Sequence, residues 1–170
     1  MRIHYTTVSK GMAKAATSRK GYFKTRSYVL EGRESMPQTI QQTVTLPAEA
    51  ERLYEMYLDP KIHAAFTGAP VAISHIPGSE FRAFNDMISG KMLYTVPRRL
   101  IVQCWRAEHW NPEDLDSTLI LTFWPEGAAG RIDLVHVNVA DHDLEGVNQG
   151  WEKYYWKPWR EYLLRKEGAP

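Results

Sequence analysis

The sequence from residue 145 to residue 166 reads EGVNQGWEKYYWKPWREYLLRK, and its pattern predicts one long amphipathic helix. Large apolar or aromatic side chains recur along it, with charged residues between them: Trp151, Tyr154, Tyr155, Trp156, Trp159, Tyr162 and Leu163. Seven such groups on about six helical turns are more than one narrow apolar stripe needs. We therefore expect a curved sheet to grip this helix on more than one side.

The strands of that sheet are predicted from runs of β-branched and aromatic residues that precede the helix. The two clearest runs, 118–124 and 132–139, are separated by the turn-like sequence PEGAAG, which favours a hairpin. Further strands are expected near residues 39–45, 71–75, 80–85, 88–96 and 99–110.

Two short helices are predicted directly after the first strand. Residues 48–58 read AEAERLYEMYL, with acidic residues in the first turn and apolar residues at helical spacing. Asp59 and Pro60 then cap and begin a second helix, which Gly68 ends. This order of elements predicts an α+β fold in which a curved antiparallel sheet wraps around the C-terminal helix. Such wrapping leaves an apolar cavity between helix and sheet.

Residues 1–35 differ in composition from the rest of the chain. They carry eight Lys or Arg residues against two Glu, a net charge of +6, whereas the 13 basic and 18 acidic residues that follow give −5. With few periodic apolar residues, this segment cannot bury enough surface to fold alone. We predict a basic, disordered N-terminal tail followed by one domain at 36–168. A plain extension, a start at Met36 and an organelle-targeting segment remain open.

The overall composition is that of a globular protein: 170 residues, 44% hydrophobic, 24% charged and a net charge of +1. The single cysteine, Cys104, excludes an intramolecular disulfide and favours a reducing, cytoplasmic location. Its apolar neighbours predict a small buried residue rather than a nucleophile. No apolar run is long enough to span a membrane. The negative charge after residue 35 opposes nucleic-acid binding.

Four stretches in this order carry a resemblance to a known family: LPAEAERLYEMYLDP, PGSEFRAFNDMISGKMLYTVPRRLIVQCWR, WNPEDLDSTLILTFWPEG and NQGWEKYYWKPWREYL. Across residues 38–166 the chain resembles the C-terminal domain of the activator of heat-shock protein 90 ATPase and its bacterial homologues. The resemblance implies the helix-grip fold, also called START-like or Bet v-like. It also implies a heat-shock protein 90 family chaperone as a candidate partner.

Two departures from the family are visible in the sequence. The eukaryotic co-chaperone has a separate N-terminal domain that makes much of its contact with the chaperone, and residues 1–35 are too short and too poor in aromatic residues to replace it. The family's usual Asp-Gly turn is here Asn85-Asp86-Met87, so we expect a different loop geometry.

The predicted cavity lies between inward-facing strand residues and the helix. We expect its lining to be Gln103, Trp105, Leu121, Phe123, Leu134, His136, Trp151, Tyr155 and Trp159. Plain core packing is an equally good interpretation of each. Trp105 and Trp151 are expected to pack against each other, and Gly150 is expected to let the helix backbone approach the sheet.

No catalytic residues are predicted, because no Ser-His-Asp elbow, phosphate-binding loop or dinucleotide fingerprint occurs. The histidines lack the spacing of a metal site, and we expect neither a metal nor a cofactor. The carboxylates of Glu113, Asp114 and Asp116 are expected to lie in a solvated loop with no base nearby. His136 shares a strand face with apolar residues, so it is either a hydrogen-bonded core histidine or a ligand contact.

Three classes of function follow from these expectations. The first is a binder of a hydrophobic small molecule or lipid in the cavity, and the second is a protein-interaction module of the co-chaperone type. An exposed patch of Trp156 and Trp159 would favour the second over the first. The third is an enzyme like the cyclases that share this fold. It requires His136 or Gln103 to face an open cavity beside another titratable group.

Overall fold

The computed structural model describes residues 38–167, so the predicted basic tail at 1–35 and its three interpretations lie outside the described residues. The strands are β1 (Gln38–Leu46), β2 (Val71–Ala72), β3 (Glu80–Ala83), β4 (Ile88–Val96), β5 (Leu100–Ala107), β6 (Ser117–Glu126) and β7 (Ala129–Val139). The helical segments are α1 (Ala50–Leu58), α2 (Pro60–Thr67), a 3-10 turn (Asp141–Asp143), α3 (Leu144–Trp151), a π turn (Glu152–Trp156) and α4 (Lys157–Glu167).

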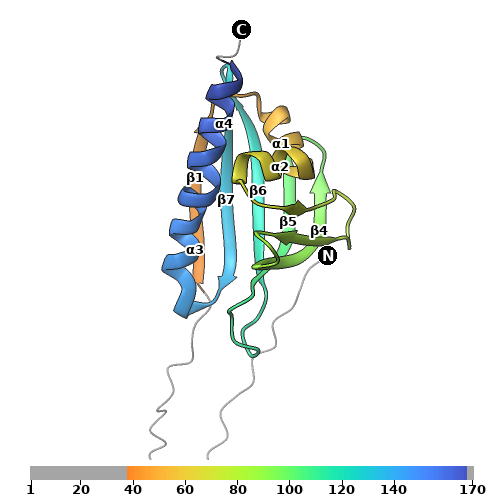
Figure 1. The fold of residues 1–170 in the computed structure, drawn as a ribbon, viewed down its shortest axis with the longest axis vertical. Coiled ribbons are helices and arrows are strands. Elements are labelled where there is room, and N and C mark those ends of the chain that lie inside the picture. Colours follow the sequence, from red (N-terminus) through yellow and green to blue (C-terminus); the bar gives the residue numbers. More distant parts are fainter. Residues whose placement is uncertain (1–37, 168–170) are drawn as a thin grey trace, which may run out of the picture. The chain divides into compact units, whose positions relative to one another are not determined.

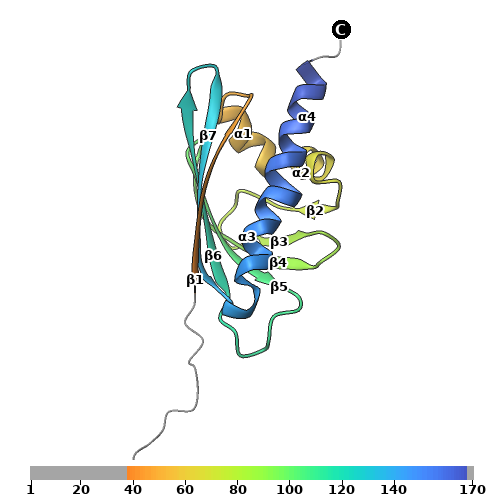
Figure 2. The same cartoon turned by 90° about the vertical axis from the view of Figure 1, so that its left-hand side faces the viewer.

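The seven strands form one antiparallel sheet in the order β1-β7-β6-β5-β4-β3-β2 (Figure 1). Figure 2 shows the C-terminal helix lying along one face of this sheet, with β2, β3 and β4 curling toward α3. On the same side, α1 packs on β6 and β7, and α2 packs on α4. The predicted α+β helix-grip fold, with two short helices after the first strand, is therefore confirmed. No helix in the described region is long and apolar enough to cross a membrane.

Three predicted strands are shorter in the structure. The strand expected at 71–75 pairs only through Val71 and Ala72, before the chain turns at Gly78, whose φ is +86°. The strand expected to reach residue 85 ends at Ala83, because the next three residues have φ values of 54°, 56° and 67°. Three successive left-handed residues cannot continue a strand. The strand expected at 99–110 ends at Ala107 and gives way to a loop.

The C-terminal helix is also less regular than its sequence predicts, because five residues form a π turn. Pro158 supplies a cause. It has no N–H, and in an α-helix its ring would collide with the carbonyl of Tyr154 four residues earlier. A wider turn directly before Pro158 moves that carbonyl away.

The π turn also helps to align a row of buried side chains. Trp151, Tyr155, Trp159 and Leu163 recur at intervals of four and are all less than 5% exposed. With 3.6 residues per turn, each step of four rotates such a row by about 40° around the helix. The wider π turn takes up part of this drift, so the row stays on one buried side of the helix.

Aromatic stacking and hydrogen bonds fix the helix in place. Trp159 stacks on Phe66 of α2, with ring centroids 4.3 Å apart. At the opposite side, Trp156 Nε1 donates to Gln42 Oε1 of β1 at 2.6 Å, and Gln42 Nε2 donates to the carbonyl of Asn148 at 2.8 Å. The helix is thus held both by α2 and by the edge strand β1.

Cys104 is a correction to the sequence analysis. It lies on the outer face of β5 and is half-buried rather than fully buried, because the inward positions of this strand are Ile101, Gln103, Trp105 and Ala107. Its thiol donates to Asp116 Oδ2 at 3.3 Å. Partial burial and the Asp116 carboxylate raise the pKa of the thiol, which keeps it protonated.

Gly90 marks the closest approach of two strands. A Cβ atom at this position would lie 1.9 Å from the carbonyl oxygen of Cys104 on β5. That oxygen belongs to the backbone of a paired strand and cannot rotate away. Only glycine allows β4 and β5 to pair at this spacing.

We expect Gly90→Ala to lower the free energy of unfolding by about 2 kcal/mol or more, because the strands must separate to admit the methyl group. Urea denaturation measures the loss. Ser89→Ala, one position away on the same strand, is the control and should change stability by less than about 0.5 kcal/mol. Equal stabilities of the two variants would contradict the steric argument.

Candidate functional site

A cavity of about 310 Å³ lies between the α3 end of the C-terminal helix and the sheet. Its wall is mostly apolar and aromatic. The lining residues are Phe84, Met87, Ile88, Trp105, Ala107, His109, Asp143, Gly146, Val147, Gly150, Trp151, Tyr154 and Tyr155. Met87 and Tyr154 are 57% and 47% exposed, so they mark the outer rim of the cavity. Trp105 and Tyr155 are at most 5% exposed and mark its inner end.

The sheet side of the cavity is built by β5 and by the β3–β4 turn. The alternation of β5 directs Trp105 and Ala107 inward. The left-handed residues after Ala83 turn the chain so that Phe84 and Met87 reach the cavity. The sequence departs from the family turn at this point, so part of the cavity wall comes from the altered loop.

Two residues on the helix side of the cavity have no side chain: Gly146 and Gly150, which are one turn apart on α3. We expected Gly150 to let the helix approach the sheet, and that expectation is wrong. A Cβ atom there would meet only Tyr154 of its own helix, at 3.7 Å, and no atom of the sheet within 4 Å. The missing side chain leaves space for the cavity instead.

The structure brings three of the nine predicted lining residues to the cavity wall: Trp105, Trp151 and Tyr155. The other six are at most 1% exposed, lie deeper in the core and do not line this cavity: Gln103, Leu121, Phe123, Leu134, His136 and Trp159. A ligand contact by any of the nine stays a prediction. The alternation of residues along the strands identified the inward-facing positions. It did not indicate at which of these positions the helix leaves a cavity.

His136 lies between the two predicted tryptophans. Its ring contacts Trp105 and Trp151 edge to face, at centroid distances of 4.9 and 5.9 Å. Ser117 Oγ donates to the carbonyl of Trp105 at 2.7 Å, so it accepts the proton of His136 Nε2, also at 2.7 Å. Trp151 Nε1 donates to Nδ1 at 3.4 Å. These bonds fit the neutral imidazole, and burial lowers its pKa to about 3.

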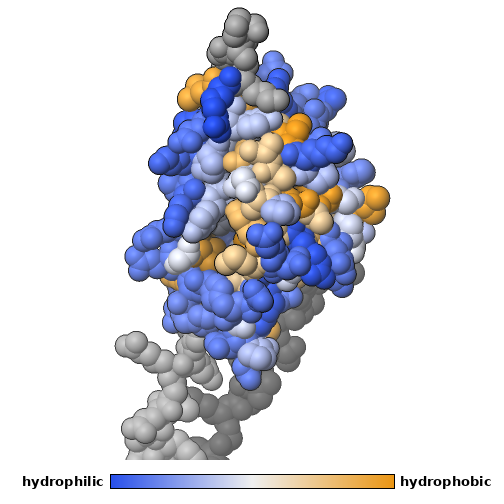
Figure 3. Space-filling view, in the orientation of Figure 1, coloured by the Kyte–Doolittle hydropathy of each residue, from blue (hydrophilic) through white to orange (hydrophobic). Residues whose placement is uncertain are grey.

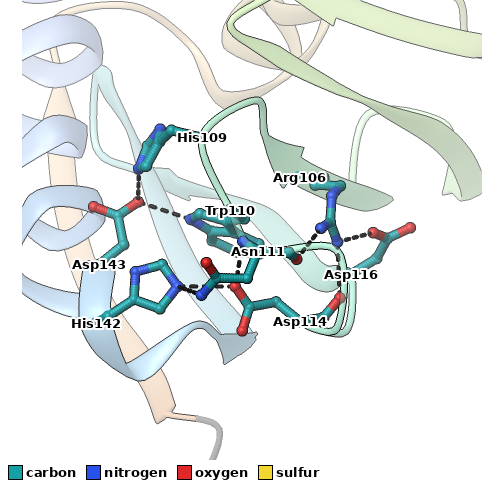
Figure 4. A network of polar contacts seen from close by, with 8 residues as sticks. All are labelled: Arg106, His109, Trp110, Asn111, Asp114, Asp116, His142 and Asp143. Atoms are coloured by element: carbon teal, nitrogen blue, oxygen red, sulfur yellow. Dashed lines mark hydrogen bonds and ion pairs between the residues drawn. The ribbon is translucent and has the colours of Figure 1, made fainter.

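A polar network surrounds the loop after β5 (Figure 4). His109 Nε2 lies 3.0 Å from Asp143 Oδ2, which also accepts from Trp110 Nε1 at 2.8 Å. In the same network, His142 Nε2 lies 2.8 Å from Asp114 Oδ2. The hydrogen bond from His142 lowers the pKa of the Asp114 carboxyl.

This network corrects the expectation that no base lies near the carboxylates of the loop. Asp114 pairs with His142, which is 28 residues away along the chain. The pairing could not be read from local spacing, because the fold alone brings the start of α3 beside the loop. His109 and Asp143, which line the cavity, were missed for the same reason.

The chemistry available at the cavity is therefore limited. Among the described residues, no Ser, Thr, Cys or Lys lines it. The pair of His109 and Asp143 on the wall tethers the loop after β5 to the start of α3. The part of the chain that the structure describes contains no group of three or more His, Cys, Asp or Glu residues suited to a metal ion. The wall is suited to apolar contact rather than to group transfer.

Comparison with known proteins gives a family match. A family model described as "Activator of Hsp90 ATPase homolog 1-like protein" matches residues 47–163. The human activator of 90 kDa heat shock protein ATPase homolog 1 is 28% identical over 113 residues, which are 66% of this chain and 33% of that protein. The chain thus matches about a third of the length of this relative.

Solved structures share the fold. An HSP90 activator from Plasmodium falciparum superposes with a TM-score of 0.62 at 21% identity, covering 69% of this chain and 89% of that one. A protein from Mesorhizobium loti superposes with a TM-score of 0.66 at 16% identity, covering 75% of this chain and 98% of that one.

The buried neutral His136 predicts a dependence of stability on pH. Its pKa is about 3 when folded and about 6.5 when unfolded. Between these values only the unfolded chain binds the proton, so stability is lost as pH falls below about 6.5. From pH 7 to pH 5 this histidine should account for about 2 kcal/mol of lost stability.

We expect His136→Gln to remove the contribution of this histidine to the pH dependence. From pH 7 to pH 5 the stability of the variant should therefore fall about 2 kcal/mol less than that of the wild type. Urea denaturation at pH 7, 6 and 5 measures both slopes. Glutamine can still donate to Ser117 and accept from Trp151, which limits the loss at pH 7. Identical slopes for the two proteins would contradict a neutral buried imidazole.

Proposed function

Since this chain belongs to the family of activator of Hsp90 ATPase homologue 1-like proteins, whose helix-grip domain it forms, we propose that it binds a hydrophobic small molecule or lipid between helix and sheet. The observation that carries the proposal is the apolar cavity of about 310 Å³. Sites for small molecules in proteins are concave and mostly apolar, with volumes of roughly 300–1,000 Å³. The cavity is at the lower end of that range.

Access from solvent supports the proposal. Met87 and Tyr154 line the cavity and are about half exposed, so an apolar molecule can enter between them without unfolding of the core. On the face that Figure 3 shows, hydrophobic residues gather in the middle and extend toward the right-hand edge, with hydrophilic residues on either side. The cytoplasmic location suggested by the single cysteine stays a prediction.

A protein-interaction role of the co-chaperone type is the second candidate. The names of the human and Plasmodium relatives suggest it, and the observation that favours it is a set of exposed apolar residues on β4, namely Leu93, Tyr94 and Val96. The patch of Trp156 and Trp159 that would have favoured it is absent, since both are at most 2% exposed. A heat-shock protein 90 family chaperone is the partner to test.

The cyclase-like alternative has less support. It requires His136 or Gln103 to face an open cavity beside another titratable group. Both side chains are fully buried, and neither lines the cavity. We therefore rank it below binding and interaction.

The first experiment tests the full chain against fatty acids, sterols and polycyclic aromatics by tryptophan fluorescence and thermal shift. Trp105 and Trp151 line the cavity, so a bound molecule should change the emission in a saturable way. Binding to the native state alone raises the melting temperature. If no compound of the panel changes the emission or raises the melting temperature, the binding proposal fails. Chaperone pull-down is then the next experiment.

We expect Gly150→Leu to weaken binding of any positive ligand at least tenfold, because the new side chain projects into the cavity. The protein should remain folded, since leucine has a better helix propensity than glycine by about 0.8 kcal/mol. Gln149→Leu, which adds an apolar side chain on the exposed face of the same helix, is the control. Unchanged affinity of Gly150→Leu would place the ligand elsewhere.

A further inference from the structure

Five buried polar atoms at or beyond the inner end of the cavity have no hydrogen-bond partner in the structure: one acceptor, His63 Nε2, and four donors. On β5 the donors are Gln103 Nε2 and Trp105 Nε1, and on the C-terminal helix they are the Tyr155 hydroxyl and Trp159 Nε1. All four donor residues are at most 5% exposed. Leaving even one such group unpaired in a protein interior is costly, so four together indicate a missing partner.

The four residues belong to two rows that face each other across the core. Trp105 and Tyr155 line the same cavity, one from the strand and one from the helix. Tyr57 connects the deeper pair: its hydroxyl donates to Gln103 Oε1 at 2.8 Å, and its ring lies 6.4 Å from those of Tyr155 and Trp159. Of the four donors, those of Trp105 and Tyr155 thus belong to the cavity wall, and those of Gln103 and Trp159 lie deeper in the core.

These four atoms are predominantly donors. An indole N–H can only donate, and the amide nitrogen of Gln103 has hydrogens to spare because its oxygen already accepts from Tyr57. Burial raises the pKa of Tyr155 far above its usual value, so its hydroxyl keeps a proton to donate. The inner end of the cavity is thus complementary to an oxygen acceptor.

The charge of that acceptor follows from what surrounds it. Within residues 38–167, no Lys or Arg lines the cavity, and the wall residues His109 and Asp143 are already paired with each other. Two buried histidines lie behind the wall: the His63 ring is 5.6 Å from that of Tyr155, and the His136 ring is 4.9 Å from that of Trp105. Burial lowers their pKa values to about 4 and about 3, so both are neutral. A buried carboxylate or phosphate would therefore find no counter-charge.

We propose that the cavity takes an apolar ligand that ends in a neutral carbonyl group, with the carbonyl oxygen accepting from the two donors of the cavity wall, the Tyr155 hydroxyl and Trp105 Nε1. The hydrocarbon part then lies toward Met87 and Tyr154 at the rim. This inference rests on the proposed function and specifies the ligand class. The π turn adds support, because such turns occur frequently at functional sites and this one contains Tyr155.

Three compounds with the same tricyclic carbon skeleton test the proposal on the full chain: fluorene, fluorenone and fluorene-9-carboxylate. Calorimetry or thermal shift gives their affinities. We expect fluorenone to bind about 3- to 10-fold tighter than fluorene, which matches one net hydrogen bond to a neutral acceptor. The carboxylate should bind more weakly than fluorene.

Tyr155→Phe removes one donor without changing the shape of the cavity. We expect this variant to bind fluorene as the wild type does, but to lose most of the preference for fluorenone. Its melting temperature should be unchanged or higher, because an unpaired buried hydroxyl is lost. Tyr94→Phe, at an exposed position of β4 that does not line the cavity, is the matched control and should keep the full preference.

The outcomes separate the two proposals. If fluorene and fluorenone bind equally well to the wild type, ordered water satisfies the donors and the carbonyl inference is overturned, while the binding function stands. Tightest binding of the carboxylate overturns the neutral acceptor, and a full preference in Tyr155→Phe overturns the role of Tyr155. If none of the three binds, the proposed function fails for this ligand class and the inference fails with it.

Discussion

The burial of the large aromatic side chains on the C-terminal helix is the constraint on which the rest of this structure depends. Trp151, Tyr155 and Trp159 occupy successive turns, and each is at most 4% exposed. A flat sheet would cover only one side of such side chains, so the sheet curves and α2 covers Trp159 from another side. The π turn before Pro158 serves the same requirement, since it keeps the aromatic residues of the row on one buried side of the helix.

The same constraint explains where the cavity lies. Near α4, the helices α1 and α2 add side chains to the core, because α1 packs on β6 and β7 and α2 packs on α4. Near α3 no additional helix is present among the described residues, and Gly146 and Gly150 contribute no side chain. The gap is closed only partly, by Trp105, Trp151 and the β3–β4 turn. The cavity is therefore a consequence of uneven filling along one gripped helix.

The sequence was sufficient to predict the architecture, because the helical spacing of aromatic residues and the runs of β-branched residues depend on local pattern alone. It did not predict the π turn, since the effect of Pro158 on the preceding turn competes with strong helical periodicity. For the site, alternation correctly directed Gln103, Trp105 and His136 inward. Alternation could not distinguish a residue that lines the cavity from one in the filled core, because that depends on the glycines of α3, the helix opposite these strands. Pairs such as His109 and Asp143 required the folded chain.

The pairing of β1 with β7 has a consequence for the synthesis of the protein. β1 is an edge strand whose one neighbour in the sheet is β7, and Gln38 pairs with Val139. A ribosome adds about 5–20 residues per second, so β1 waits roughly 5–20 s for its partner to be made. During that time Ile40, Val44 and Leu46, which are buried in the finished domain, have no sheet to cover them. Among the strands that the structure describes, β1 is thus the one most exposed to aggregation while the chain is being made.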